Sequence, residues 1–571
     1  MMEWEGKNLL CFGDNLVFLA DRELFPDECV DLIYLDPPFN SQQSYNVLFK
    51  EAAGTPAAAQ IKAFEDTWRW DMAANEALTR IHTDPSVPAP LVELMRTFMS
   101  FLRPSPMMAY LVQMAIRLVH MHRVLKPTGS LYLHCDPTAS HYLKIVLDAV
   151  FGPKNFVNEI VWKRTKAHSD AKRWSRVSDV ILFFSKTQNF TWHPKHTTYD
   201  DDYVGSKYRH TDADSRRFRL DNMTSPHPRP NMMYEWKGHA CPQYGWRYSK
   251  ETMAKLDAEG RIWYPSDKRK RPQLKRYLDE MPGVLLTTIW TDIPPINSQA
   301  QERLGYPTQK PIELLKRIVS ASSKPGDVVM DPFCGCGTTI DAVETLNREQ
   351  PGAPARRWIG IDVTHLSINL IKHRLTRFDP LPDYEVLGEP TSANDAAALA
   401  RGDPFQFQFW ALGLIGARPR GGKRKKGADQ GIDGVRFFVD EVRGKQPAIK
   451  EMLVQVKGGK VGVRDVRDLV GTLAREKAPM GVLLTLNAPT APMKAEAASA
   501  GSYTSPWDGK PYPVVQVLTV EELLKDPYKP NPRCLRVPGG TTQHTLPEPP
   551  KHRRKAAGQG ALPFDGEPRN P

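Results

Sequence analysis

The amino-acid sequence predicts an α/β protein with a large domain built around a mostly parallel sheet and a smaller α/β domain near the C-terminal end. In the first 190 residues or so, short apolar runs such as VDLIYLD, GSLYLHCD and DVILFFS alternate with longer helical patterns. Such alternation indicates parallel strands joined by crossover helices. The pattern stops near 195, returns near 306 and occurs a third time from about 403 to 528. The large domain therefore carries an insertion.

The composition along the chain predicts six segments. The insertion is rich in Tyr, Trp, His, Arg and Lys, a polar stretch before the smaller domain reads as a linker, and the last residues are rich in Pro, Gly and Lys, which favours disorder. The segments are 1–194 and 291–385 for the two parts of the large domain, 195–290 for the insertion, 386–402 for the linker, 403–528 for the smaller domain and 529–571 for the tail.

The charge balance favours a polyanionic partner. The 571 residues include 77 Lys and Arg against 65 Asp and Glu, a formal net charge of +12. An excess of this size favours nucleic acid, although a basic tail on a neutral enzyme would give the same total. The sequence has no apolar run of the ~20 residues that span a bilayer and no secretory signal, so no membrane association is expected. Seven scattered cysteines without a CxxC pair predict a reducing, cytoplasmic setting without a disulfide framework.

The first chemical motif follows the apolar run Val30–Leu35. It is Asp36-Pro37-Pro38-Phe39, and its prolines cannot continue a parallel strand because they lack the N–H and have a fixed φ. The motif is therefore expected in the loop at the carboxyl end of the strand, where open α/β sheets place their active sites. An ordinary strand-terminating Pro-Pro turn is the alternative.

The second motif, Asp331-Pro-Phe-Cys-Gly-Cys-Gly-Thr-Thr339, lies between a short strand and a helix that begins near Thr338. Its two glycines permit a tight turn and a close approach to a ligand, but the third glycine of a dinucleotide fingerprint is missing. The next strand ends in Asp362, whose carboxylate could accept hydrogen bonds from both hydroxyls of a ribose. An uncharged adenosine, as in S-adenosylmethionine, fits this pattern. A nucleotide-dependent oxidoreductase is the alternative, and it leaves the first motif unexplained.

With these motifs the chain resembles the amino-specific DNA methyltransferases in which the DPP(F/Y) motif precedes the cofactor motif. Three further elements support the resemblance: Phe12-Gly-Asp-Asn-Leu16, Leu125-Lys-Pro-Thr-Gly-Ser130 and Tyr306-Pro-Thr-Gln-Lys-Pro311. The resemblance covers about 1–380. It implies a Rossmann-like S-adenosylmethionine-dependent methyltransferase sheet with an inserted target-recognition region that contacts double-stranded DNA. A solvated basic insertion is the alternative for that region.

The resemblance also implies the roles of single residues. The DPPF residues would be catalytic, and a second set would bind the cofactor: Asp14, Lys310, Asp331, Phe333, Gly335, Gly337, Thr338 and Asp362. The Asp36 carboxylate and the Pro37 carbonyl can accept the two N–H groups of an exocyclic amino group and align its nitrogen with the methyl group. Phe39 would stack on the base once it is flipped out of the duplex. Aspartate at the first position is typical of adenine-N6 enzymes, and cytosine N4 remains the alternative target.

The C-terminal domain carries a separate motif. Gly-Ile-Asp433-Gly precedes one apolar run, and Gln455-Val-Lys457 ends the next. Strand alternation places Gln455 and Lys457 on the same face, near the start of the Asp433 strand. Asp433 and the Gln455 amide oxygen could hold Mg²⁺, and Lys457 could orient or activate the attacking water.

This pattern resembles the Mrr-type branch of the PD-(D/E)xK restriction nucleases over about 403–525. Two departures stand out: the helix Phe405–Trp410 has glutamines where many relatives have a glutamate, and Gln455 stands in place of Glu. An active nuclease, a nuclease fold kept only for DNA binding, and an unrelated sheet with an Asp433–Lys457 salt bridge are the alternatives.

Taken together, the motifs predict an adenine methyltransferase fused to a Mg²⁺-dependent endonuclease, a modification and restriction protein on one chain. S-adenosylmethionine and Mg²⁺ are the expected cofactors and double-stranded DNA is the expected partner. No Walker loop GxxxxGK(S/T) occurs, so no helicase is expected in this chain. A homodimer is one option for its assembly.

Overall fold

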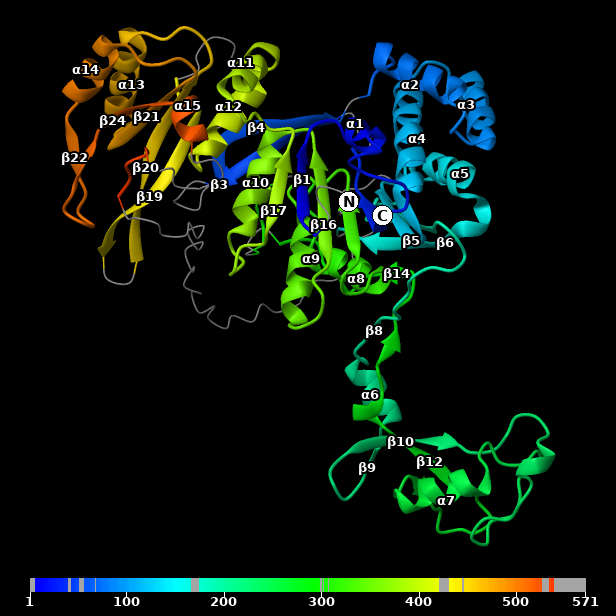
Figure 1. Ribbon diagram of the computed structural model, residues 1–571. Helices are drawn as coiled ribbons and strands as arrows, with labels where there is room; N and C mark the ends of the chain where they lie inside the picture. The colour runs from blue at the N-terminus through cyan, green and yellow to red at the C-terminus, as the bar shows by residue number, and fades with distance from the viewer. Residues whose placement is uncertain are drawn as a thin grey trace, which may run out of the picture. The chain divides into compact units, whose positions relative to one another are not determined.

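The computed structural model (Figure 1) describes residues 6–38, 43–50, 56–66, 68–165, 174–297, 300, 302–304, 306, 308–420, 431–443, 446–525 and 534–538. The predicted stacking residue Phe39, the segment 421–430 before the Asp433 motif and most of the predicted tail lie outside the described residues. The chain divides into two compact units, 193–287 and the remainder.

The first unit contains a nine-stranded sheet with the order β14-β6-β7-β5-β2-β15-β16-β1-β17. Its strands are β1 (Asn8–Phe12), β2 (Val30–Leu35), β5 (Leu125–Cys135), β6 (Phe156–Lys163), β7 (Ser178–Ser185), β14 (Ile289–Trp290), β15 (Val328–Asp331), β16 (Arg357–Asp362) and β17 (Tyr384–Leu387). β2 is buried along its whole length, which is why its sequence reads as a continuous apolar run. A hairpin of β3 (Gln43–Lys50) and β4 (Pro56–Asp66) forms a separate two-stranded sheet.

The expectation of parallel strands is wrong for β7. β7 pairs antiparallel with both β5 and β6, whereas β2, β15, β16 and β1 pair in parallel. Among the described residues no helix separates β6 from β7, and a parallel pair would need a crossover connection, so these two strands pair in antiparallel fashion. An apolar run cannot distinguish the two directions, because a strand buried on both faces looks the same in either.

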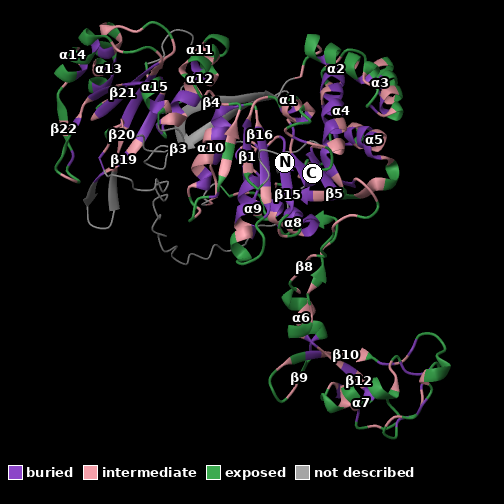
Figure 2. Cartoon of the chain, in the orientation of Figure 1, coloured by how far each residue is buried: buried purple, intermediate pink, exposed green. Residues whose placement is uncertain are grey.

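Helices cover both faces of the sheet. They are α1 (Asn15–Ala20), α2 (Met72–Thr83), α3 (Ala89–Leu102), α4 (Pro106–Val124), α5 (Ser140–Phe151), η1 (Pro153–Asn155), α8 (Ile312–Ser322), α9 (Thr338–Glu349) and α10 (His365–Leu375). One core cluster combines the sheet with α4 and α5, and the other combines it with α8, α9 and α10. Figure 2 shows α4 buried along most of its length, because α2, α3 and α5 surround it.

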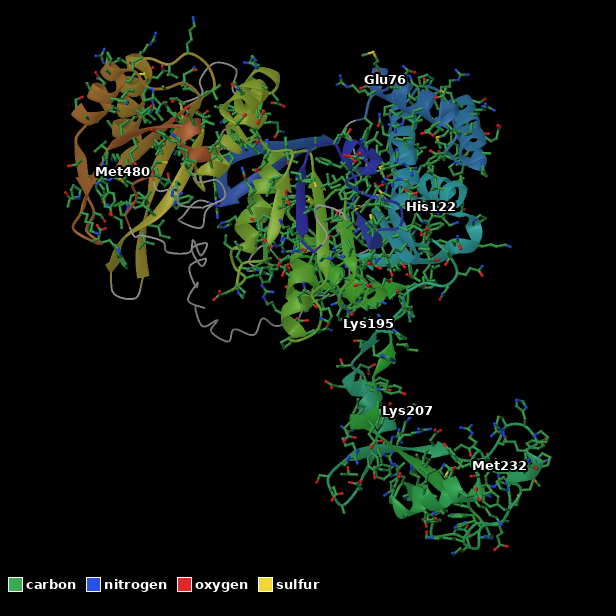
Figure 3. The ribbon with its side chains drawn as sticks, viewed as in Figure 1. Glu76, His122, Lys195, Lys207, Met232 and Met480 are labelled. Carbon is green, nitrogen blue, oxygen red and sulfur yellow. The ribbon has the colours of Figure 1, made fainter. Side chains whose placement is uncertain are left out.

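Residues 193–287 form the second unit, with its own small core of aromatic and aliphatic side chains around Trp246. A four-stranded sheet has the order β11-β12-β10-β9, and β8 pairs with β13. The elements are β8 (His196–Thr197), α6 (Asp201–Lys207), β9 (His210–Thr211), β10 (Arg217–Asn222), η2 (Pro230–Met232), α7 (Lys250–Ala258), β11 (Ile262–Trp263), β12 (Gln273–Tyr277), η3 (Leu278–Glu280) and β13 (Val284–Leu285). Figure 3 draws the side chains of this unit, with Lys195, Lys207 and Met232 labelled.

The C-terminal part is a five-stranded sheet of order β18-β19-β20-β21-β24 with helices on both faces. Its elements are α12 (Pro404–Leu414), β18 (Arg418–Pro419), β19 (Gly434–Arg443), β20 (Gln446–Lys457), α13 (Val463–Glu476), β21 (Met480–Thr485), α14 (Ala491–Ser499), β22 (Ser502–Thr504), β23 (Pro511–Pro513), β24 (Val515–Thr519) and α15 (Val520–Leu524). The segment predicted as a linker contains helix α11 (Ala393–Gly402), which Ser392 and Asp395 close with a capping box. Among the described helices, none is long and apolar enough to cross a membrane.

Candidate methyltransferase and nuclease sites

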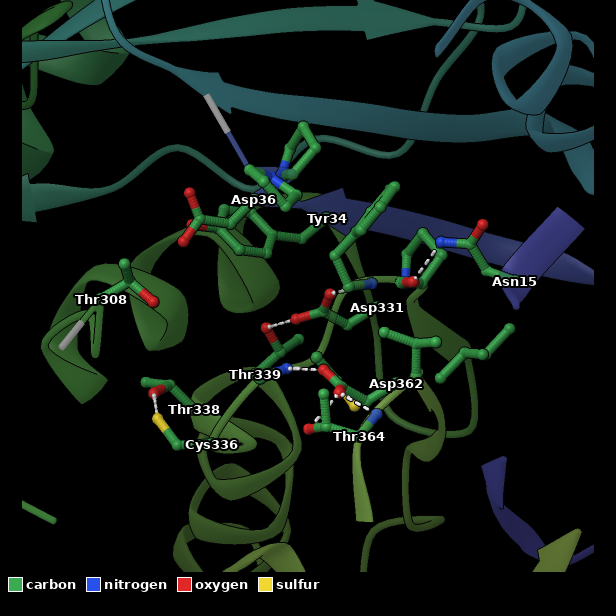
Figure 4. A pocket seen from close by; sticks show the side chains of 18 of the residues that line it. Asn15, Tyr34, Asp36, Thr308, Asp331, Cys336, Thr338, Thr339, Asp362 and Thr364 are labelled. Atoms are coloured by element: carbon green, nitrogen blue, oxygen red, sulfur yellow. Dashed lines mark hydrogen bonds between the residues drawn. The ribbon is translucent and has the colours of Figure 1, made fainter. Parts of the chain in front are cut away.

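The carboxyl ends of β2, β15 and β16 surround a pocket of about 360 Å³ (Figure 4). These strands are neighbours in the sheet, so the acids that follow or end them meet at one edge. Ten residues predicted from the sequence line the pocket: Asp14, Asp36, Pro37, Pro38, Lys310, Asp331, Phe333, Gly335, Thr338 and Asp362. Gly337 does not line it and instead forms the N-cap of α9.

Asp36 offers a free acceptor to this pocket. Its Oδ2 forms an ion pair with Lys310, a residue predicted to hold the cofactor. Its Oδ1 is buried and has no hydrogen-bond partner among the described residues. A buried carboxylate oxygen without a donor is costly unless a ligand supplies one. The arrangement therefore suits a ligand with an N–H group.

Hydrogen bonds join the glycine loop, residues 332–337, to Asp362 at the end of β16. The Gly335 N–H donates to Asp362 Oδ2 (2.9 Å), while the Thr364 N–H and hydroxyl donate to Oδ1 (both 2.9 Å). Gly335 and Gly337 have φ of +49° and +75°, which side chains other than glycine rarely adopt. Asp362 thus positions the loop and keeps further lone pairs for a ligand.

Burial perturbs two acids of the pocket. It is the largest cause that raises the pKa of Asp331 to about 7, and the charges of Asp36 and Asp362 act in the same direction. Burial also raises the pKa of Asp362. Three carboxyl groups around one pocket repel one another, so a cationic ligand is favoured there.

Arg117 supports the site and was not singled out from the sequence, and Asn15 was named there only as part of the Phe12–Leu16 element. Asp14 caps α1 through the Leu16 N–H (2.9 Å) and pairs with Arg117 of α4 (2.7 Å). Buried Asn15 accepts from Arg117 Nε and donates to the Pro332 carbonyl (both 2.7 Å). Arg117 therefore connects the N-terminal element to the glycine loop. The signal was an arginine in the middle of a largely apolar helical pattern.

Aromatic side chains complete the wall of the pocket. Tyr34, Trp68 and Tyr306 line it, and of these only Tyr306 was named from the sequence, as the first residue of the Tyr306–Pro311 element. The Tyr306 ring lies 3.4 Å from where a Cβ on Gly335 would stand, so it covers the glycine loop closely. Tyr34 was detectable, because alternation along β2 places it on the same face as Asp36.

The C-terminal motif also forms a cluster. Asp433 accepts hydrogen bonds from Gln408 Nε2 (3.0 Å) and the Val456 N–H (2.7 Å). Gln455 donates to the Gly431 carbonyl, and its Oε1 is buried without a partner among the described residues. Lys457 pairs with Asp465 at 3.4 Å. One carboxylate and an unpaired amide oxygen fit a hard cation, although the described part of the chain holds no group of three His, Cys, Asp or Glu that could bind a metal.

The pocket, its free carboxylate oxygen and the glycine loop are the features that the resemblance to the amino-specific DNA methyltransferases leads us to expect. A family model described as DNA methylase matches residues 30–373, more than half of the chain, and the protein belongs to this family. A model described as restriction endonuclease matches residues 404–511. These matches confirm the predicted fold class and the predicted pairing of a DNA-methylase domain with a restriction-endonuclease domain on one chain.

Curated relatives match the methylase part. The chain is 32% identical over 280 residues to the type II methyltransferase M.EcaI of Enterobacter cloacae, covering 48% of this chain and 60% of the relative. It is 26% identical over 358 residues to the type III StyLTI Mod subunit of Salmonella typhimurium, covering 60% and 51%. The chain thus spans half to three fifths of the length of these two relatives. A solved structure of a DNA modification methylase from Thermus thermophilus with S-adenosylmethionine is 16% identical, covers 67% of this chain and 99% of its own, and has a TM-score of 0.31.

Proposed function

We propose that this chain transfers a methyl group from S-adenosylmethionine to N6 of adenine in double-stranded DNA. The observation that carries the proposal is the buried, unpaired Oδ1 of Asp36 at the edge of the pocket. An exocyclic amino group supplies the N–H that this oxygen lacks. The aspartate at the head of the DPPF motif favours adenine, and N4 of cytosine is the competing target.

Different residues of this chain would bind the methyl donor and the target base. Asp331, Asp362 and the glycine loop would bind the donor, whose cationic sulfonium supplies the transferable methyl group. Asp36 and the Pro37 carbonyl would hold the two N–H groups of the base and orient the nitrogen lone pair, so that catalysis is chiefly positioning and electrostatics. Phe39 would stack on the flipped base, as its place after Pro38 implies.

Residues 193–287 would read the DNA. This unit has 18 Lys and Arg against 13 Asp and Glu. Some of these cations are held inside the unit, such as Arg216 with Asp279 and Glu280. The consecutive cations Lys268 to Arg271 are instead all exposed, which suits contacts to phosphates.

The C-terminal domain would cut DNA that has not been methylated. Asp433 and the free amide oxygen of Gln455 would hold Mg²⁺, and Lys457 would orient the attacking water. A cytoplasmic setting suits an enzyme that acts on the cell's own DNA. A homodimer is one form in which two cuts could be made.

Sequencing of modified bases in DNA incubated with the protein and S-adenosylmethionine tests the methylation. N6-methyladenine in one sequence context is the expected result, N4-methylcytosine would overturn the adenine assignment, and unmodified DNA would overturn the activity. A plasmid that carries the mapped site tests the nuclease. We expect cleavage of the unmethylated plasmid with Mg²⁺, none with a chelator and protection by prior methylation, whereas intact plasmid across Mg²⁺ and Mn²⁺ concentrations favours a fold kept only for DNA binding.

A further inference from the structure

A row of buried, hydrogen-bonded polar side chains runs across the sheet from β2, the strand that precedes Asp36. The Tyr34 hydroxyl lies 2.9 Å from His134 Nδ1, and His134 Nε2 lies 3.2 Å from Asp179 Oδ2. The three residues come from the neighbouring strands β2, β5 and β7, and each is at most 2% exposed. Arg164 closes the far end, with its Nε 3.1 Å from Asp179 Oδ1 and its side chain about half exposed.

The chemistry of the groups fixes the direction of the hydrogen bonds. A carboxylate only accepts, so His134 Nε2 carries a proton and donates it to Asp179. Burial is the largest cause that raises the pKa of Tyr34 well above its ordinary value, so the phenol keeps its proton. When His134 carries only this one proton, the Tyr34 hydroxyl donates to its Nδ1, and the lone pairs of the Tyr34 oxygen remain for a further donor.

Tyr34, at one end of this row of side chains, lies at the methyltransferase pocket. Tyr34 lines the pocket and precedes Asp36 by two residues on the same strand face. The negative charge of Asp36 contributes to the raised pKa of Tyr34, after burial. At the far end, burial alone would raise the pKa of Asp179, but the hydrogen bond from His134 and the positive charges of Lys310 and Arg164 lower it. Asp179 is thus an anion placed to stabilise a positive charge on His134.

We propose that Tyr34, His134 and Asp179 form a proton relay that takes up the proton released by the target amino group during methylation. This proposal rests on the proposed methyltransferase function. The nitrogen lone pair forms the bond to the methyl carbon, and the methyl–sulfur bond breaks with its electron pair passing to sulfur. The nitrogen then carries one proton too many. That proton passes to the Tyr34 oxygen while the Tyr34 proton passes to His134 Nδ1, which leaves an imidazolium beside the Asp179 carboxylate.

The relay gives the released proton a more favourable acceptor than Asp36. A proton that stayed on Asp36 would cancel its ion pair with Lys310. A proton on His134 instead gains the Asp179 carboxylate as a partner in a low-dielectric core, where such a pair is strong. After the product leaves, the reverse movement through Tyr34 returns the proton to water in the pocket.

Single-turnover methylation in H₂O and D₂O tests the relay with three variants. Tyr34→Phe removes the hydroxyl, and Asp179→Asn keeps an acceptor for His134 but removes the charge. Tyr132→Phe is the matched control, because Tyr132 is the register partner of Tyr34 on β5 and is equally buried, but bonds to Ser322 and does not line the pocket.

We expect Tyr34→Phe to slow methyl transfer on the order of 10²-fold, Asp179→Asn less, and Tyr132→Phe not at all. Wild type should be slower in D₂O, both relay variants should lose this isotope effect, and affinity for S-adenosylmethionine should stay unchanged. If Tyr34→Phe transfers the methyl group at the wild-type rate, the network is only structural. The same holds if the relay variants lose rate only in proportion to a lowered melting temperature and keep the isotope effect. A wild type that transfers no methyl group would overturn the function and the relay together.

Discussion

Replacing Asp331 with asparagine should stabilise the methylase sheet at alkaline pH. Asp331 ends β15, is 3% exposed, and accepts hydrogen bonds from the Phe333 N–H (3.1 Å) and the Thr339 hydroxyl. Its folded-state pKa of about 7 lies above the ordinary value of 3.8, chiefly because of burial. Folding therefore favours the protonated acid, and ionising it inside the fold costs free energy.

The size and sign of the effect follow from linkage. The stability that comes from the protonated acid is complete below about pH 4 and is lost as the pH rises through about 7. The difference between 3.8 and about 7, at about 1.36 kcal/mol per pH unit, amounts to about 4 kcal/mol. Water that enters the pocket screens the charge, so we expect a gain on the order of 2 kcal/mol for Asp331→Asn at pH 8 and almost none near pH 4. Asparagine can keep both hydrogen bonds, because its oxygen accepts and its amide donates to the threonine oxygen.

Urea unfolding of wild type and Asp331→Asn at a series of pH values from 4 to 8 measures the effect. The difference in free energy of unfolding should grow with pH and level off above about 7. A difference independent of pH, or a variant less stable than wild type at pH 8, would refute the reasoning. Because a cation in the pocket favours the carboxylate, binding of S-adenosylmethionine near pH 7 should also release protons, which calorimetry in buffers of different ionisation enthalpy detects.

Three further substitutions, two of them paired with a comparison variant, test separate parts of the molecule. Asp36→Asn should lower the methylation rate on the order of 10²-fold or more while the dissociation constant of S-adenosylmethionine, measured by calorimetry, stays within a small factor. Gly337→Ala should lower the free energy of unfolding by about 1–3 kcal/mol, measured by thermal unfolding, since its φ is +75° and a Cβ would meet an isoleucine at 2.7 Å. Gly471→Ala, at an open helical position, should raise the free energy of unfolding by about 0.5–1 kcal/mol. Lys457→Ala should abolish DNA cleavage but not methylation, and Arg464→Ala, which removes an exposed charge from the same domain, should leave both intact.

Motifs that are contiguous in sequence were the predictable part of the site. Strand ends, helix starts and glycine turns follow from local patterns, and neighbouring parallel strands then bring Asp36, Asp331 and Asp362 to one edge without knowledge of the full topology. The antiparallel direction of β7 did not follow, because direction depends on connections and a fully buried strand carries no periodic signal of it. The segment 386–402 was read as a linker from its Gly, Pro and polar residues, although Ser392 begins a capping box for α11, whose sequence is rich in alanine.

Side-chain pairs distant in sequence could not be predicted in the same way. Arg117 reaches Asp14 and Asn15 across about a hundred residues, and His134 links Tyr34 to Asp179 only because β5 lies between β2 and β7. Such contacts depend on strand register, and one shift of register would turn each side chain to the opposite face.

Lys310 shows that a sequence motif can place a side chain at a site without specifying which residue it pairs with. The PTQKP element places a lysine beside the pocket, the resemblance assigns it to the cofactor, and in the structure it pairs with Asp36. Several carboxylates meet at this edge of the sheet, so the sequence could not decide which of them pairs with Lys310. Burial raises the pKa of Asp331 and Asp362, the two acids that end the neighbouring strands. A positively charged sulfonium is the ligand that would relieve this, because its charge favours the ionised form of the two acids.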